Sequence, residues 1–383
     1  LADTAPTVLA ASGLACAANT DPLTRYGQLF PAAQFGSLTP GIAPLRDDAF
    51  KSLLVGGPQY TGTVGGYNVV TWDPRGEFAS GGQLNIDNPM LEGRDTSAMI
   101  SWLTSATNPA SSQVRTQAGD PLIGMTGGSY GGGIQMTTVD PRIKSIVPSI
   151  AWNSLNDSLY PNGIFKTAWA NNLAEALLLT GASAINRINS QVTQALITGN
   201  LFAFVSETAQ AVLASSGPTA LLTKLSIPTM YDQGTVDALF PLQQALNNAQ
   251  TQLEQNPFFA GANAALVKMI WFCGGHGVCT TQTFQQQTAQ NTVMFLENIA
   301  WVNRYTKDYL AADPTINGLL SAVAPFQWWD QKGTALASFV GMPWTNAFQN
   351  TAPIVVQQAA GGRINSFTSK SGPLTSEDAA GGV

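Results

Sequence analysis

Apolar and polar positions through the middle of the chain form short blocks that differ in period. The run GYNVVTW at 66–72 is compact and β-rich, and it predicts a buried strand. In EGRDTSAMISWL at 92–103, apolar residues fall at helical spacing after acidic ones, which predicts a helix. An apolar run at 122–125, a small-residue segment at 131–138 and IKSIVPSI at 143–150 predict a strand, a helix and a strand. This alternation predicts a parallel sheet covered by helices.

Between residues 152 and 224 the strand pattern stops, and alanine- and leucine-rich pieces predict helices instead. An insertion of about 70 residues is too long for an ordinary connection between strands, so we expect a helical lid there. Strand-like IPTMY at 227–231 returns the chain to the sheet. VKMIWF at 267–272 is the last core strand that the pattern predicts clearly, and a helix is expected at 288–307.

The expected fold class is therefore α/β, with a mostly parallel sheet, helices on both faces and a helical lid insertion. The core is expected at 66–151 and 225–310, with the lid at 152–224 between its two parts. Residues 1–65 have no clear period, so this N-terminal region is either unusual or incomplete. Residues 311–383 are expected to be a small appended segment with a flexible end.

Charge narrows the classes of partner. Only 10% of the 383 residues are charged, against about 25% in average proteins, and the net charge is −6. No basic cluster is present, so a nucleic-acid partner is not expected. No apolar run reaches the roughly 18 residues of a membrane span. The neutral polar composition suits a secreted or cell-envelope protein, and the first residue, Leu1, indicates a processed or truncated chain.

The sequence GGSYG at 127–131 matches the G-x-S-x-G pattern between a predicted strand and a predicted helix. That context is typical of a nucleophile elbow, a sharp turn that strains the serine backbone and exposes its hydroxyl group. Flanking glycines remove Cβ atoms that would clash, and the helix N-terminus favours developing negative charge. Ser129 is therefore the candidate nucleophile. The alternative is an ordinary glycine-rich turn.

A serine nucleophile needs a base, and His276 is the one histidine of the chain. It lies between glycines just after the last predicted core strand, although a lone histidine is often a surface or core residue. Asp232 and Asp237 both follow the strand at 227–231 and qualify as the acid. We favour Asp237, because its loop can turn the carboxylate toward His276, whereas Asp232 would be a solvated strand-end charge or a local cap. The order serine, aspartate, histidine is that of the α/β-hydrolases.

The backbone N–H of Tyr130, which follows the candidate nucleophile, is the expected first donor of an oxyanion hole. GGPQY at 56–60 lies where the loop with the second donor belongs, so Tyr60 is a weak candidate. The alternative for this stretch is a plain Gly-Pro turn.

Cys273 and Cys279 bracket the histidine, and a disulfide there would staple its loop. Two free thiols or a metal site are the alternatives. One histidine and two cysteines would leave zinc short of ligands, so no metal or other cofactor is expected. The third cysteine, Cys16, is expected to be free or to lack its partner in the chain.

With these residues placed, the sequence resembles α/β-hydrolases of the Xaa-Pro dipeptidyl-peptidase and cocaine-esterase-like group over roughly residues 66–330. The resemblance rests on YNVVTWDPRG with the SGGQ after it, MTGGSYGGG, DPRIKSIVPSIAW, IPTMYDQGTVDALFPL and WFCGGHGVC. It implies the nucleophile, acid and base given above, the Tyr130 N–H in the oxyanion hole and a tyrosine hydroxyl that Tyr60 matches only weakly. Three features depart from the group: the first 60 residues, the segment at 131–140, which is short for the expected helix, and too little C-terminal chain for a jelly-roll domain.

We therefore expect a serine hydrolase acting on a small-molecule ester or peptide. An apolar acyl ester is favoured because the expected lid is rich in alanine and leucine. One alternative is an Xaa-Pro dipeptidyl-peptidase, which needs an acidic group such as Glu175 to hold the substrate amine. Another is a non-catalytic envelope or scaffold protein on the same fold. The oligomeric state is not predicted.

Overall fold

The computed structural model describes residues 70, 72–77, 80–179, 187–276, 279, 281–307, 320, 323–333 and 336–345. Most of the strand predicted at 66–72 lies outside these ranges, as do Tyr60 and Cys16. Within the described ranges, no helix is both long enough and apolar enough to cross a membrane.

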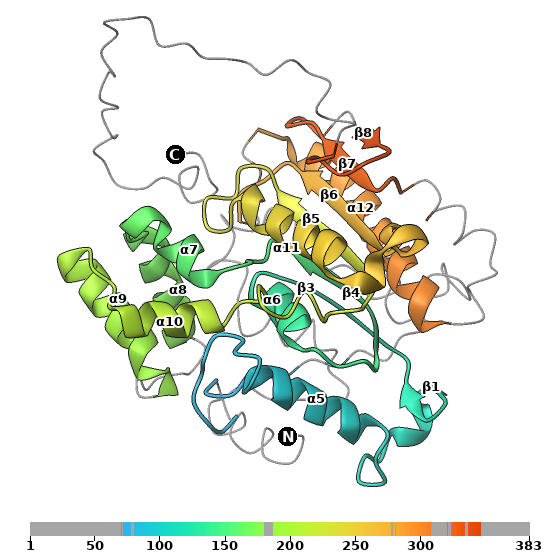
Figure 1. The fold of residues 1–383 in the computed structure, drawn as a ribbon, viewed down its shortest axis with the longest axis horizontal. Coiled ribbons are helices and arrows are strands. Elements are labelled where there is room, and N and C mark those ends of the chain that lie inside the picture. Colours follow the sequence, from blue (N-terminus) through green and yellow to red (C-terminus); the bar gives the residue numbers. More distant parts are fainter. Residues whose placement is uncertain are drawn as a thin grey trace, which may run out of the picture.

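A six-stranded sheet forms the centre of the described structure (Figure 1). In spatial order its strands are β3 (Ile123–Gly128), β4 (Ile143–Ser149), β5 (Thr229–Gly234), β6 (Val267–Phe272), β7 (Phe326–Trp329) and β8 (Leu336–Phe339). The first five strands are parallel, and β8 runs antiparallel to β7. The prediction of a mostly parallel sheet is confirmed. A separate short pair is formed by β1 (Thr116–Gln117) and β2 (Asp120–Pro121).

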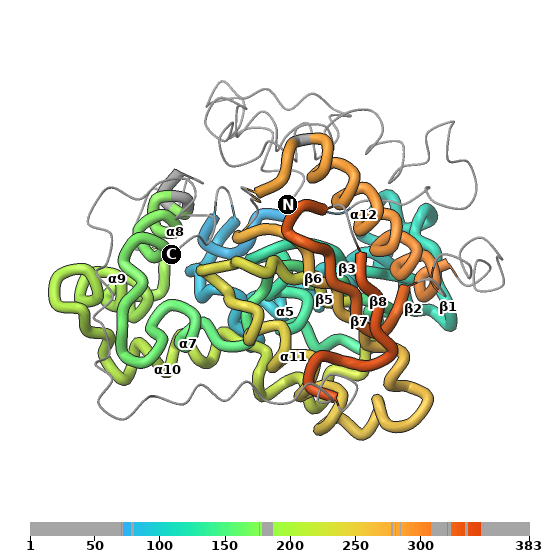
Figure 2. The backbone as a smooth tube through the Cα atoms, turned by 90° about the horizontal axis from the view of Figure 1, so that it is seen from above, coloured from blue at the N-terminus to red at the C-terminus, as the bar shows by residue number. Residues whose placement is uncertain are grey.

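Helices cover both faces of this sheet. α5 (Glu92–Leu103), α6 (Tyr130–Thr137) and α11 (Leu242–Gln255) contribute to the apolar cluster on one face, and α12 (Phe284–Thr306) covers the other. Figure 2 shows α11 and α12 on opposite sides of the strands. Successive residues of a strand point to opposite faces, so Ile146 packs into the first cluster and Val147 into the second.

Four more helices lie between β4 and β5, as the alanine- and leucine-rich pattern predicts: α7 (Leu155–Leu159), α8 (Thr167–Leu179), α9 (Ser190–Phe202) and α10 (Glu207–Ser215). Three of them have an N-cap residue whose polar side chain accepts a hydrogen bond from a backbone N–H group of the first turn: Ser154, Asn189 and Ser206. Each cap satisfies an N–H group that has no acceptor within the helix. These inserted helices lie to one side of the sheet (Figure 1). A lid function for them stays a prediction.

Short 3₁₀ helices occur in the connections: η2 (Ser111–Gln113), η3 (Pro161–Gly163), η5 (Pro257–Phe259) and η6 (Gly261–Leu266). Several predicted boundaries differ from those observed. β5 ends at Gly234 rather than at residue 231, and α12 begins at Phe284, four residues before the predicted start. The earlier helix start follows from a capping box in which Thr283 and Gln286 bond each other's backbone N–H groups.

The sheet also continues beyond β6, where the clear strand pattern ends. β7 and β8 fall inside 311–383, the range predicted as an appended segment, yet β7 pairs with β6 in parallel. Each has four residues, too few to show a period. Their place is set by partners distant in the chain: the ring of Trp271 on β6 packs edge-on against Phe326 at 4.7 Å and Trp328 at 5.5 Å.

Candidate active site

Ser129 occupies the sharp turn between β3 and α6. Its backbone has φ 55° and ψ −118°, a conformation that costs energy for any residue other than glycine. The surrounding backbone holds it there. The Ser129 N–H donates to the carbonyl of Ser149 at 3.0 Å, and the Ser129 carbonyl accepts from the N–H groups of Gly132 and Gly133 at 2.8 and 2.9 Å. The structure thus has the strand, strained turn and helix that G-x-S-x-G predicts.

Close packing around α6 requires some of its glycines. A Cβ atom on Gly133 would lie 2.4 Å from ring carbons of Trp152 and 2.6 Å from a carboxylate oxygen of Asp87. A Cβ atom on Gly132 would lie 2.7 Å from the Ser149 carbonyl oxygen. On Gly131, by contrast, a Cβ atom would meet nothing within 4 Å.

We therefore expect Gly133→Ala to destabilise the fold by about 2–3 kcal/mol, since a methyl group would be forced into a filled space. The matched control is Gly131→Ala in the same helix, which should be neutral or slightly stabilising because alanine favours helix. Thermal unfolding of the three proteins measures both effects. Equal melting temperatures for Gly133→Ala and the wild type would contradict the close packing.

His276 lies between the other two predicted residues. Its Nε2 atom is 2.7 Å from Ser129 Oγ, and its Nδ1 atom is 2.9 Å from Asp237 Oδ2. The second carboxylate oxygen of Asp237 accepts the backbone N–H groups of Leu239 and Phe240, both at 2.8 Å. The Asp237 side chain is fully buried, and the His276 side chain is 11% exposed. An acceptor on Nδ1 favours the tautomer whose Nε2 can take a proton from Ser129.

Three residues that the sequence analysis did not single out also contact this site. The rings of Phe240 and Trp169 meet the imidazole of His276 edge-on, at centroid distances of 5.1 and 5.6 Å. The Lys166 ammonium donates to the carbonyls of Ala238 and Leu239, at 2.5 and 3.1 Å. Burial lowers the pKa of Lys166. Phe240 follows the predicted acid closely in sequence, but nothing in the sequence pattern points to Trp169 or Lys166.

Asp232, the alternative acid, lies in a different environment. It is 2% exposed, and its Oδ2 atom accepts hydrogen bonds from Ser149 Oγ at 3.1 Å and from Asn298 Nδ2 at 2.6 Å. Of the two candidates, it is Asp237 whose carboxylate bonds the imidazole of His276. The expectation that Asp232 would be a solvated charge is wrong, because β5 is covered on both faces.

Three further predicted site residues are Tyr130, Glu175 and Tyr60. The Tyr130 N–H is the first of α6, and the first N–H groups of a helix have no acceptor within it. Its ring lies 6.4 Å from that of Trp152. Glu175 is on α8 with an exposed side chain, and the second oxyanion candidate, Tyr60, is outside the described residues.

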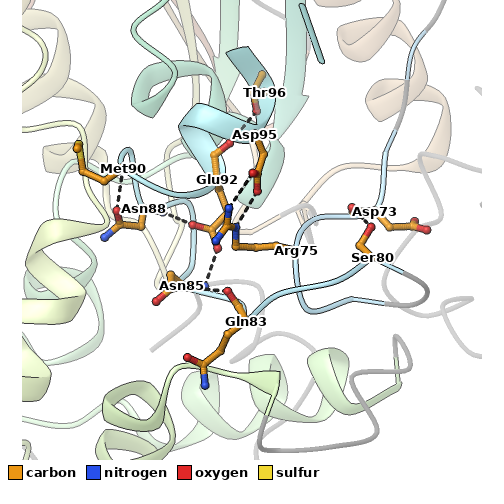
Figure 3. A network of polar contacts seen from close by, with 10 residues as sticks. All are labelled: Asp73, Arg75, Ser80, Gln83, Asn85, Asn88, Met90, Glu92, Asp95 and Thr96. Carbon is orange, nitrogen blue, oxygen red and sulfur yellow. Dashed lines mark hydrogen bonds and ion pairs between the residues drawn. The ribbon is translucent and has the colours of Figure 1, made fainter. Parts of the chain in front are cut away.

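A network of polar contacts around Arg75 and Glu92 holds the loop before α5 (Figure 3). Arg75 of the DPRG motif makes two 2.7 Å bonds to the carboxylate of Asp95. Glu92 accepts the backbone N–H groups of Asn85 at 2.6 Å and Asn88 at 3.0 Å. Asp87, between these two residues, is fully buried, and burial together with the nearby Glu92 charge raises its pKa. The network thus fixes the loop whose Asp87 side chain faces Gly133.

Cys273 and Cys279 form a disulfide with a Cα–Cα distance of 5.5 Å, which confirms the predicted pairing. The bond closes the loop that carries His276. In the described part of the chain, no group of three or more His, Cys, Asp or Glu side chains is arranged to hold a metal ion.

Replacing both cysteines by serine is expected to cost about 2 kcal/mol of stability, because the unfolded chain regains the freedom of the short closed loop. Thermal unfolding of the Cys273→Ser, Cys279→Ser double variant measures this loss. Cys16→Ser is the control for loss of a thiol. If the double variant and this control had the same melting temperature, the disulfide would not contribute to stability.

Solved structures resemble this chain at low sequence identity. A CocE/NonD family hydrolase from Staphylococcus aureus is 14% identical with a TM-score of 0.49, and the match covers 71% of this chain and 42% of that one. An aminopeptidase from the marine sediment archaeon Thaumarchaeota archaeon is 16% identical with a TM-score of 0.42, covering 70% and 47%. An esterase from Pyrococcus furiosus is 15% identical with a TM-score of 0.38, covering 63% and 71%. The chain spans less than half the length of the first two proteins. No match was found among curated protein sequences.

The sequence also matches the model of a known protein family. The model of the S15 family, described as X-Pro dipeptidyl-peptidase, matches residues 57–256. This range is more than half of the chain, and it contains the Ser129 turn, the inserted helices and Asp237. The parallel sheet with helices on both faces is that of the α/β-hydrolase fold. The chain therefore belongs to the S15 family of X-Pro dipeptidyl-peptidases.

Proposed function

We propose that the protein is a serine hydrolase that cleaves acyl esters through a covalent acyl-enzyme. The observation that carries the proposal is the unbroken line of hydrogen bonds from Ser129 Oγ through His276 to Asp237. Ser129 Oγ attacks the acyl carbonyl carbon while His276 Nε2 takes the hydroxyl proton. His276 then gives that proton to the departing alcohol oxygen, and water attacks the acyl-enzyme by the same route.

Asp237 supports this proton transfer in two ways. Its bond to Nδ1 orients the imidazole, and its negative charge stabilises the imidazolium that forms during attack. The two N–H groups of Leu239 and Phe240 fix the carboxylate in turn. The Tyr130 N–H at the start of α6 is the proposed donor to the oxyanion of the tetrahedral intermediate.

The surroundings of the base favour an ester with an apolar acyl group. The largely apolar rings of Trp169 and Phe240 border the imidazole. The family match favours the second candidate, an Xaa-Pro dipeptidyl-peptidase. That activity needs an acidic group to bind the substrate's free amine, and Glu175 on α8 is our proposal for it. The disulfide supports a secreted or cell-envelope location, where oxidising conditions preserve such bonds.

Fluorophosphonate labelling with peptide mapping tests the proposal on the wild type and on His276→Ala. Labelling at Ser129 that is lost in the variant is the expected result. A folded wild-type protein that does not react would overturn it in favour of a non-catalytic scaffold. The rates of hydrolysis of p-nitrophenyl esters and of Xaa-Pro-p-nitroanilides are then compared to distinguish the esterase from the peptidase. Faster cleavage of the anilides would replace the ester assignment with the peptidase one.

A further inference from the structure

Asp232 is a buried carboxyl group that the proposed mechanism does not use. It lies on β5 near the middle of the sheet, directly opposite Ser149 on β4. Ser149 in turn lies opposite Gly128, the residue before the nucleophile. The pairing therefore places Asp232 two strands from the Ser129 turn, at the same level of the sheet.

Hydrogen bonds connect these positions. Ser149 Oγ donates to Asp232 Oδ2 at 3.1 Å, and the Ser149 carbonyl accepts the Ser129 N–H at 3.0 Å. The next residue, Ile150, donates its N–H to the Asp232 carbonyl at 2.7 Å. From α12, which covers this face of the sheet, Asn298 donates to the same carboxylate oxygen at 2.6 Å. Asp232 thus contacts Ser149 through its side chain and Ile150 through its backbone.

The bonds around Ser149 are important because two residues that they connect, Ser129 and Ile150, have a strained backbone. Ser129 has φ 55° and Ile150 has φ 40°, both in the left-handed region that side chains with a Cβ disfavour. Such residues persist only when surrounding bonds over-determine their conformation. The bonds from Asp232 to Ser149 and Ile150 supply part of that restraint.

We infer that Asp232 is a positioning residue: its carboxylate fixes Ser149, whose carbonyl holds the Ser129 backbone and so keeps the hydroxyl aligned with His276. The inference rests on the proposed hydrolase function. Asp232 takes no part in the chemistry itself. Its loss should affect the rate of acylation more than the binding of substrate, since a small misplacement of a reacting group lowers the rate of the chemical step.

The protonation state of Asp232 gives a second readout. Burial raises its pKa to about 7, and the charge of Glu297 on α12 acts in the same direction, while the bonds from Asn298 and Ser149 oppose the shift. The pKa of Glu297 is raised by burial, and the positive charge of Lys268 on β6 partly opposes this shift. Between pH 4 and 7 the folded protein therefore holds a proton that the unfolded chain has lost, and its stability falls as pH rises through this window.

The test compares Asp232→Asn and Ser149→Ala with the wild type. Asparagine keeps the shape but removes the charge, which weakens the hydrogen bonds that Oδ2 accepts from Ser149 and Asn298. Ser149→Ala removes the first of these bonds and is the smaller change should the first variant fail to fold. Glu297→Gln is the matched control, because this neighbouring buried acid of α12 bonds Gln327 rather than Ser149. The measurements are kcat and KM for a p-nitrophenyl ester, the fluorophosphonate labelling rate and the melting temperature at pH 5 and 8.

We expect Asp232→Asn to lower kcat and the labelling rate by about ten- to a hundred-fold with KM within two-fold. Ser149→Ala should act in the same direction, and the double variant should be no worse than the sum of the two effects predicts. The wild type loses stability as Asp232 ionises, whereas the asparagine variant does not. The melting temperature of Asp232→Asn minus that of the wild type should therefore be more positive at pH 8 than at pH 5. The kcat of Asp232→Asn should also depend less steeply on acid pH, because one titrating group is gone.

Full kcat in folded Asp232→Asn, or in folded Ser149→Ala, would overturn the inference and leave Asp232 a structural residue, whatever its melting temperature. An equal loss of kcat in Glu297→Gln would also overturn it, since the effect would then be general to buried acids of this layer. A folded wild type without labelling or activity would instead overturn the proposed function, and the inference with it.

Discussion

Ser129→Ala is expected to lower kcat for ester hydrolysis by about a million-fold, to the level left by substrate binding and the oxyanion donor alone. The reason is that the covalent route disappears with the hydroxyl that lies 2.7 Å from His276 Nε2. The fold should be unaffected, because the substitution removes one oxygen atom and leaves the strained backbone in place. Steady-state kinetics, with a melting curve for each protein, measure both results.

The matched control for Ser129→Ala is Ser112→Ala, since Ser112 is an exposed serine in η2, the 3₁₀ helix before β1. It should keep wild-type kcat. Residual activity in Ser129→Ala within a hundred-fold of wild type, in a preparation free of contaminating hydrolase, would show that another residue is the nucleophile.

Asp237→Asn is expected to lower kcat by about ten-thousand-fold with little change in KM. The amide would present either an oxygen or an N–H to His276 Nδ1, and it carries no charge to stabilise the imidazolium. The carboxylate also accepts two backbone N–H groups, so an asparagine oriented to keep those bonds directs its amide N–H at the imidazole. The imidazole is then held in the tautomer that cannot take the serine proton.

Asp157→Asn serves as the control, because Asp157 is an exposed aspartate at the start of α7. Kinetics of Asp237→Asn beside Asp232→Asn also distinguish the two acids that the sequence offers. A larger loss in Asp232→Asn than in Asp237→Asn would contradict the role proposed for Asp237.

The parts of the site that lie within one short stretch of the chain could be predicted from the sequence. The strand before Ser129, the glycine-rich turn and α6 are encoded in one stretch of the chain, so the turn could be predicted. His276 was identifiable because the chain has no other histidine. The preference for Asp237 over Asp232 rested on loop position, and the structure brings Asp237 to the imidazole.

What could not be predicted depends on contacts between distant segments. Trp169 on α8 and Lys166 just before this helix reach the site from the segment between β4 and β5, and no local period or motif marks such a contact. β7 and β8 are defined by pairing with β6 rather than by their own pattern. The burial of Asp232 likewise follows from the packing of α12 over the sheet, so its partner Asn298 is recognisable only in three dimensions.

The position of the site along the chain has a consequence for how it is assembled. Ser129 and His276 are 147 residues apart in sequence, and Asp237 and His276 are 39 apart. Bringing such distant segments together closes large loops, whose entropic cost is repaid only when the intervening strands have paired. The alignment of the three side chains is therefore among the last native features to form. Enzymatic turnover would consequently report that β3 to β6 have paired, and a nascent chain would stay inert until β6 has docked.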